Sequence, residues 1–196
     1  MVVESSLLFF AYLIGSIPTG AILSRIYGNV DIRKEGSGNI GAANVYRTLG
    51  KIIGVFTFLG DVLKGTAPVL ISFWLLDGAH REIWISLTAL MVLVGHCYPL
   101  FLKFQGGKGV ATALGAFLAI DPWVIPGAFI IFILVYYKWK YVSLGSLLAT
   151  GSVPVLVAFS SASRIYVFLA TVFTIFIFYR HRENIKRLWQ GREIKV

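Results

Sequence analysis

A glycine-rich segment in the first quarter of the chain combines residue types that can hold a phosphate. It reads Glu35-Gly-Ser-Gly-Asn-Ile-Gly-Ala-Ala-Asn-Val-Tyr-Arg47. Glycines allow backbone N–H groups to approach an anion closely, and a helix that begins after them points its positive end at that anion. Asn44, Arg47 and Lys51 follow at helical spacing, which predicts that they share one face of this helix. We therefore predict an anion-binding loop with a basic helix behind it.

The glycine spacing of this segment also matches the G-x-G-x-x-G pattern of dinucleotide-binding loops. That match carries little weight, because no strand precedes the segment and no βαβ unit surrounds it. The candidate phosphate-binding residues here are Gly36, Gly38, Asn39, Gly41 and Asn44. The alternative is an ordinary polar loop followed by a solvated basic helix start, since connecting loops are commonly polar.

A second glycine-rich segment reads Phe104-Gln-Gly-Gly-Lys-Gly-Val-Ala-Thr112. It is not a Walker A loop, because no glycine lies six residues before the lysine and no Ser or Thr follows it. Glycines around one lysine at the start of a helix can still form a nest for phosphate. The candidate residues are Gly106, Gly107, Lys108 and Gly109. The alternative is a flexible turn with a lysine that only orients the chain in the membrane.

Two further polar segments lie later in the chain. Ser143 can cap the helix that follows it, or it can offer its hydroxyl to a substrate together with Ser146, one turn further on. In the tail, His181 and Asn184 lie three residues apart and face the same way on a helix. Most basic residues of the tail suit contact with anionic lipid headgroups. His181 and Asn184 suit that role less well, because neither carries a fixed charge at neutral pH.

Asp61 and Lys64 are ionisable residues inside an apolar segment. Such groups are costly at membrane depth and are usually functional or paired with each other. Their spacing of three residues places them one helical turn apart, so we predict a structural ion pair. A catalytic role is the alternative.

Apolar helices are the elements that must position these residues. The sequence is 57% hydrophobic and only 14% charged, whereas soluble domains are about 45–50% apolar and about 25% charged. A membrane-spanning helix needs about 20 mainly apolar residues. The predicted helical segments are 5–27, 52–76, 83–102, 110–120, 123–137, 142–159 and 165–179. Segment 110–120 is too short to cross alone, so it pairs with 123–137 as two short helices meeting near Pro122, or the two form one broken crossing.

The distribution of basic residues favours the first of these arrangements. With seven crossings, 15 of the 18 Lys and Arg lie on one side of the membrane, and such an excess marks the cytoplasmic side. We predict an all-α polytopic bundle of about seven transmembrane segments, with the N-terminus outside and the C-terminus in the cytoplasm. Residues 1–196 form a single integral membrane domain in this prediction.

Composition also restricts the partners. The net charge of +9 is explained by the loops on that side, so no nucleic acid partner is predicted. Cys97 is the single cysteine, which leaves no disulfide framework, and no cluster of His, Cys and carboxylates indicates a metal. No metal and no cofactor are predicted.

Taken together, these segments resemble the bacterial acyl-phosphate-dependent glycerol-3-phosphate acyltransferases, over nearly the whole chain. Each motif is weak alone, but the ordered set is specific. The matching motifs are Gly15-Ser-Ile-Pro-Thr-Gly20, Gly36-Ser-Gly-Asn-Ile-Gly-Ala-Ala-Asn44 with Arg47, Asp61 and Lys64, Gly95-His96, Gly106-Gly-Lys-Gly109 and His181-Arg-Glu-Asn184.

The resemblance implies a small enzyme of phospholipid synthesis in the bacterial inner membrane, with its active site facing the cytoplasm. Such an enzyme moves a fatty acyl group from acyl phosphate to the 1-hydroxyl of glycerol 3-phosphate, giving lysophosphatidic acid and phosphate. By resemblance, Ser37 and Arg47 are catalytic, Lys108 and its glycines bind glycerol 3-phosphate, and His181 and Asn184 belong to a third motif. The implied partners are the two substrates and membrane lipids. A monomer is predicted separately and is not part of what the resemblance implies.

A small transporter or channel for phosphorylated anions is the competing class. A broken helix near Pro122 and the intramembrane Asp61 and Lys64 are typical of transporters. Against that class, the glycine-rich segments lie on one side of the membrane and the chain shows no internal repeat.

Overall fold

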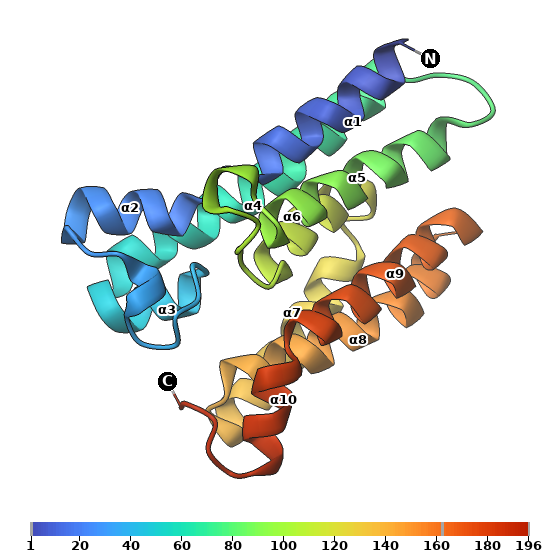
Figure 1. Cartoon of the computed structure of the whole chain (residues 1–196). Coiled ribbons are helices and arrows are strands. Elements are labelled where there is room, and N and C mark those ends of the chain that lie inside the picture. Colours follow the sequence, from blue (N-terminus) through green and yellow to red (C-terminus); the bar gives the residue numbers. More distant parts are fainter. Residues whose placement is uncertain (1, 162, 196) are drawn as a thin grey trace. The chain divides into compact units, whose positions relative to one another are not determined.

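The computed structural model describes residues 2–161 and 163–195, and the regular secondary structure of those residues is helical, as the hydropathy pattern predicts. The chain divides into two compact units, Met1–Ala116 and Phe117–Val196, with the boundary inside α6. The helices, labelled in Figure 1, are α1 (Val2–Gly15), α2 (Thr19–Gly28), η1 (Ile32–Lys34), α3 (Ala42–Leu49), α4 (Lys51–Leu75), α5 (Arg81–Cys97), η2 (Leu100–Leu102), α6 (Val110–Ile120), α7 (Val124–Trp139), α8 (Val142–Ser160), α9 (Arg164–Arg180) and α10 (Arg182–Trp189).

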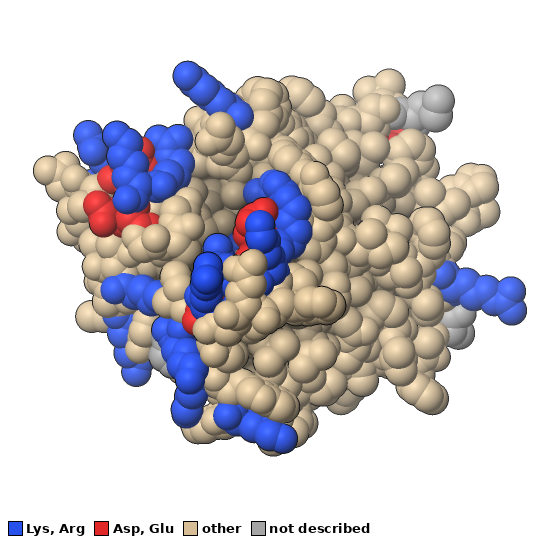
Figure 2. Space-filling view, turned by 60° about the horizontal axis from the view of Figure 1, so that its bottom comes forward, with Lys and Arg blue, Asp and Glu red and all other residues tan. Residues whose placement is uncertain are grey.

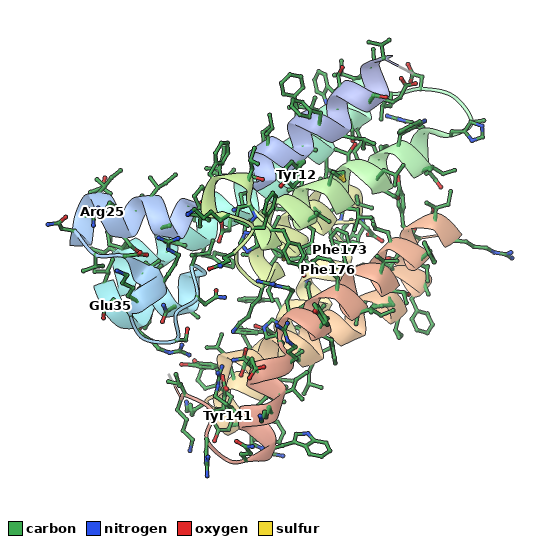
Figure 3. All side chains as sticks on the ribbon, viewed as in Figure 1. Tyr12, Arg25, Glu35, Tyr141, Phe173 and Phe176 are labelled. Atoms are coloured by element: carbon green, nitrogen blue, oxygen red, sulfur yellow. The ribbon has the colours of Figure 1, made fainter. Side chains whose placement is uncertain are left out.

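Small residues allow the long helices of the first unit to pack closely, α1 and α4 both against α5. A Cβ atom on Gly15 would overlap the backbone of Val92, and one on Gly95 would overlap the carbonyl of Tyr12. Small residues at such crossings are typical of membrane helix pairs. The hydroxyl of Tyr12, which is labelled on α1 in Figure 3, also donates to the carbonyl oxygen of Tyr98 at the end of α5, at 3.0 Å.

The first apolar segment, predicted over 5–27, is found as the candidate span Val2–Gly28, but it consists of two helices with a break between them. The break between α1 and α2 is Ser16-Ile-Pro18, where proline lacks the N–H that a helix would need. The carbonyl of Ile17 accepts a hydrogen bond from Lys64 Nζ at 2.8 Å. Irregular backbone is tolerated at membrane depth when its polar groups are satisfied by neighbouring protein, and Lys64 provides this.

The helix that follows the first glycine-rich segment is α3, and it is shorter than the spacing predicts. Helix α3 ends at Leu49. The next residue, Gly50, has a positive φ of 87°, and this turn of the backbone separates α3 from α4. Lys51 is therefore the first residue of α4 and is exposed. The prediction that Lys51 shares a helix face with Asn44 and Arg47 is wrong, because the chain turns at the glycine.

The second unit packs α8 against both α7 and α9. The rings of Phe117 and Phe173 meet edge to face with their centres 5.5 Å apart. The Ser160 hydroxyl at the end of α8 donates to the Asp121 carboxylate, which lies in the turn before α7. At the opposite end of α9, the chain bends by 62° into the short helix α10.

Length and hydropathy make several of these helical segments able to cross a bilayer. In the described residues four qualify directly, and the bent pair α9 and α10 makes a fifth. The four are Val2–Gly28, Lys51–Leu75, Arg81–Leu102 and Val142–Ser160. The short apolar helices α6 and α7 account for the remaining predicted segments, and the count of seven crossings and the orientation stay predictions. On the face shown in Figure 2, Lys and Arg form separate groups among residues that are mostly uncharged.

Candidate functional site

The first glycine-rich loop is organised around the side chain of Asn44, which is 2% exposed. Its Nδ2 atom donates to the carbonyl oxygens of Glu35 and Asn39, both at 2.9 Å, and lies 3.3 Å from that of Ile32. Its Oδ1 atom accepts from the backbone N–H of Ser37 at 2.8 Å. A buried amide that reaches four backbone groups holds the loop in one conformation.

The backbone of this loop requires its glycines. Gly36 and Gly38 have positive φ values of 55° and 70°, a region that other residues rarely adopt. A Cβ atom on Gly36 would also overlap Asn44 Oδ1. Asn39 Oδ1 accepts from the backbone N–H of Gly41 at 2.8 Å. Both asparagines thus serve as scaffold for the loop, and their direct contact with a phosphate stays a prediction.

Ser37 and Arg47 are the residues of this segment whose side chains could act on a phosphate or a carbonyl group. Both are half-buried. Asn44 holds the backbone of Ser37, and Arg47 lies on α3 one turn after Asn44. The scaffold therefore places a hydroxyl and a guanidinium at defined positions beside the same loop.

The second glycine-rich loop packs against the C-terminal end of α5. The N–H groups of Gly106 and Gly107 donate to the carbonyls of Cys97 and His96, each at 3.1 Å. These two donors are turned toward α5 and satisfy carbonyls that a helix end leaves unpaired. The predicted nest therefore cannot rest on them, and Lys108, which is half-buried, is the loop's candidate ligand for a phosphate.

Asp61 and Lys64 form the ion pair that their spacing predicts, with Nζ and Oδ1 2.8 Å apart. Both side chains are buried. His96 joins them, with its Nδ1 atom 3.6 Å from the same carboxylate oxygen. The cluster connects α4 with the last turn of α5, at the point where the second glycine-rich loop docks. Among the described residues no group of three or more His, Cys, Asp or Glu is arranged to hold a metal.

His181 lies at the bend between α9 and α10 in the second unit and is 3% exposed. Its Nδ1 atom is 2.8 Å from the carbonyl oxygen of Ile177. Because a carbonyl only accepts, Nδ1 must carry a hydrogen. In the neutral ring, Nε2 is then the nitrogen that can accept a proton or a hydrogen bond.

A carboxylate near the C-terminus organises the rest of this motif. Glu193 Oε1 accepts from Ser143 Oγ at 3.0 Å and from Asn184 Nδ2 at 2.7 Å, and its Oε2 accepts from Arg187 Nε at 2.9 Å. Burial raises the pKa of Glu193, but the hydrogen bonds from Arg187, Asn184 and Ser143 outweigh that effect and hold the pKa below its ordinary value. The carboxylate is thus ionised at neutral pH and ties α8, α10 and the tail together.

This arrangement corrects one prediction and sharpens another. The residue that precedes α8 is Tyr141, so Ser143 lies inside the helix and is not its N-cap. Asn184 is 4% exposed, and its Oδ1 atom is buried with no hydrogen-bond partner in the described residues. Because the Glu193 carboxylate can only accept a hydrogen bond, it must face Nδ2 of Asn184. The Oδ1 atom of Asn184 therefore points away from Glu193. That oxygen is available for a donor such as a hydroxyl. Ser146 is buried one turn after Ser143 on α8.

Sequence reasoning missed Glu193 and gave His96 no role beyond its place in a motif. Glu193 is the last acidic residue of the chain and stands between basic residues in Gly191-Arg-Glu-Ile-Lys195. A lone carboxylate in a basic tail is a signal that could have indicated it. The signal for His96 was weaker, since a histidine in an apolar segment is usually a satisfied core residue.

Comparison with known proteins places the chain among membrane acyltransferases. The family model described as "Glycerol-3-phosphate acyltransferase" matches residues 5–191. The chain is 49% identical over 187 residues to a glycerol-3-phosphate acyltransferase of Syntrophotalea carbinolica, covering 95% of this chain and 94% of that one. It is 46% identical over 193 residues to the protein of that name from Geobacter sulfurreducens, covering 98% and 97%.

Two solved structures have the same fold. One is the glycerol 3-phosphate form of the integral membrane glycerol 3-phosphate acyltransferase PlsY (YgiH), with a TM-score of 0.92 and 42% identity over 98% of this chain and 95% of that one. The other is the lysophosphatidic acid form of PlsY, with a TM-score of 0.90 and 41% identity over 98% and 94%.

Proposed function

The chain belongs to the glycerol-3-phosphate acyltransferase family, and from this membership we propose that it uses acyl phosphate as its acyl donor. It is a multi-pass membrane acyltransferase that acylates glycerol 3-phosphate. In the proposed reaction the 1-hydroxyl of glycerol 3-phosphate takes the acyl group, giving lysophosphatidic acid and inorganic phosphate. The reaction is an early acylation of phospholipid synthesis.

The structural observation that supports this proposal is the pair of cations in the first unit. Arg47 and Lys108 are half-buried, each beside its own glycine-rich loop. Acyl phosphate and glycerol 3-phosphate each carry one phosphate, so two separate cations match the pair of substrates. Charge-assisted contacts of this kind are stronger than neutral hydrogen bonds.

The reaction does not need a covalent intermediate on the protein, because phosphate is a good leaving group. The glycerol hydroxyl oxygen attacks the acyl carbon, a new C–O bond forms, and the bond from that carbon to the phosphate oxygen breaks. Negative charge develops on the carbonyl oxygen and on the departing phosphate, and positioned cations and N–H groups stabilise both. We assign this stabilisation to Arg47 and Ser37, and we assign to Lys108 the binding of the glycerol 3-phosphate phosphate, which positions the hydroxyl. No acyl-enzyme intermediate is needed.

The hydroxyl proton needs an acceptor, and the sequence motifs suggest two candidates. The departing phosphate is one. It is bonded to the acyl carbon that the hydroxyl attacks, so its oxygens lie close to the hydroxyl proton. His181 Nε2 is the other. We assign the proton to phosphate and a binding role to His181 and Asn184, because the buried Asn184 Oδ1 atom suits a hydroxyl donor. A histidine base would contribute about 10²–10⁴-fold to the rate.

Purified wild-type protein with acyl phosphate and glycerol 3-phosphate tests the donor. Lysophosphatidic acid and phosphate should appear in equal amounts, and acyl-CoA should give little product in the matched reaction. Product formed from acyl-CoA alone would refute the donor assignment. The transporter class is set aside because the relatives are named as acyltransferases.

Removal of either cation tests the site. Each of Lys108→Ala and Arg47→Ala loses charge-assisted hydrogen bonds worth about 1.5–3 kcal/mol, so activity should fall about tenfold to more than a hundredfold. Arg25→Ala is the control, because Arg25 is exposed on α2 (Figure 3). Turnover in both variants equal to that of the control would refute the assignment.

The location of the reaction is also part of the proposal. The excess of Lys and Arg in the loops that carry both glycine-rich segments supports a bacterial inner membrane protein with its active site facing the cytoplasm. Both water-soluble species, glycerol 3-phosphate and phosphate, would exchange with the cytoplasm, while the acyl chains stay in the membrane. A monomer is proposed.

A further inference from the structure

His96 is buried, ionisable and unused by the reaction described above. It lies in the last turn of α5 and faces two different neighbours. On one side its Nδ1 atom approaches the Asp61 carboxylate at 3.6 Å. On the other side its ring covers the α-carbon of Gly107, where an added Cβ atom would overlap Nε2. The imidazole thus stands between the intramembrane ion pair and the glycine-rich loop.

The loop is held on α5 by its backbone as well. Gly106 and Gly107 donate to the carbonyls of Cys97 and His96. Gly109 has a positive φ of 92°, and a Cβ atom there would overlap the Leu93 side chain. The glycines on both sides of Lys108 therefore rest directly on the end of α5. Their small size serves this close contact.

We infer that His96 is a positioning residue for substrate binding, which sets the place of Lys108 by supporting the loop at Gly107. This inference rests on the proposed role of Lys108 as a ligand for glycerol 3-phosphate. The Asp61 carboxylate contacts the imidazole on the side away from the loop. Lys64 forms the ion pair with Asp61 and also donates a hydrogen bond to the carbonyl of Ile17. The intramembrane ion pair acts on catalysis through this chain of contacts, without touching the substrate.

The His96 ring cannot easily move away to make room for a larger side chain at position 107. A side chain in a close-packed interior has little room to change rotamer, and His96 is held between Asp61 and the loop backbone. A methyl group added to Gly107 must therefore move the loop, and Lys108 with it. Misplacement of a binding group by about 1 Å can cost on the order of 10²-fold in rate.

The test is a double-mutant cycle between His96 and Gly107. Gly107→Ala adds the overlapping methyl group. His96→Asn keeps an amide group near the position of Nδ1, facing Asp61, and removes the part of the ring that faces the loop. Gly151→Ala is the control, because a Cβ atom on Gly151 meets only ordinary contacts, at 3.7 Å or more from Phe178.

The readouts are kcat, the KM for each substrate, and the rise in melting temperature caused by glycerol 3-phosphate. Gly107→Ala should raise the KM for glycerol 3-phosphate by about tenfold or more, with the KM for acyl phosphate within about twofold of wild type. His96→Asn should raise the same KM. The double variant should have a lower KM than Gly107→Ala alone, because the shorter side chain makes room for the methyl group.

Two results would overturn the inference. One is a KM for glycerol 3-phosphate in Gly107→Ala equal to that of Gly151→Ala. The other is a double variant whose KM rises by the full product of the two single effects, since independent sites combine in that way. A lower melting temperature of His96→Asn with both KM values unchanged would also overturn the inference, because it would indicate a purely structural role for His96.

The outcome stays separate from that of the proposed donor. If wild-type protein makes no lysophosphatidic acid from acyl phosphate, the donor assignment fails. The double-mutant cycle then compares only the rise in melting temperature that glycerol 3-phosphate causes in each variant. This rise measures binding without any acyl donor, because a ligand stabilises the protein only to the extent that it binds. A stabilisation that is lost in Gly107→Ala and regained in the double variant would support the role of His96 without any donor.

Discussion

Asn44→Asp is expected to release the first glycine-rich loop while leaving the helices in place. The substitution keeps the shape of the side chain and the Oδ1 acceptor for Ser37 N–H. It removes the amide hydrogens that the carbonyls of Glu35 and Asn39 now accept at 2.9 Å. It also places the second carboxylate oxygen, in the position of Nδ2, against those two carbonyl oxygens, and these oxygens repel one another.

The size of the effect follows from the two lost hydrogen bonds. A buried polar group left without its partner costs about 1–3 kcal/mol, so the two carbonyls cost about 2–6 kcal/mol. A carboxylate in the first turn of α3 gains about 0.3–1 kcal/mol from the helix dipole. The loss therefore exceeds the gain. A net loss of about 2 kcal/mol lowers the ratio of ordered to released loop about thirtyfold.

The assay is the initial rate of lysophosphatidic acid formation, together with protease cleavage between residues 35 and 41. Asn44→Asp should lose most of its turnover and become open to cleavage in that loop. The control is Asn29→Asp, the same chemical change at an exposed residue that follows α2. Turnover and cleavage in Asn44→Asp within about twofold of this control, or about 0.4 kcal/mol, would refute the view that Asn44 organises the loop.

Three further predictions concern the second unit and the membrane. Glu193→Gln should melt at a lower temperature than wild type at neutral pH. Because the hydrogen bonds lower the folded-state pKa of Glu193, their stabilisation is complete above about pH 4.3 and is lost as the pH falls through that lowered pKa, so the difference in melting temperature should narrow in acid. A difference that widens there would contradict this. His181→Gln keeps hydrogen-bonding capacity but cannot act as a base, so it should retain more than about a tenth of wild-type turnover. A loss of about a thousandfold in turnover, with unchanged affinity for glycerol 3-phosphate, would instead make His181 the base. Cysteines placed at Gly50 and Gln105 should be labelled only from the cytoplasmic side and one at Gly78 only from outside, and labelling of Gln105 from outside would contradict seven crossings.

The sequence by itself determined the helices and the family. Apolar runs of about 20 residues report membrane helices because an uninterrupted backbone must satisfy its own hydrogen bonds in lipid. This physics is local, so α4, α8 and α9 are found within a few residues of the predicted segments. The Asp61–Lys64 pair was predictable for the same reason, since one helical turn alone places the two side chains together.

Only the tertiary structure decided what the polar residues do. Helical spacing places Asn44 and Arg47 on related faces, but the direction in which each face points depends on α4 and on the loop that folds over α3. Glycine-rich segments can bind an anion or can pack against a helix, and the contact of Gly107 with His96 comes from residues that are not neighbours in sequence.

Contacts between residues far apart in the sequence depend on the tertiary structure alone. Glu193 reaches Ser143 across 50 positions, and Lys64 reaches the carbonyl of Ile17 across 47. No periodicity or spacing encodes such pairs, because each depends on how several helices pack at once. The sequence supplies residue types that can form these contacts, and the packing of the helices selects which of them do.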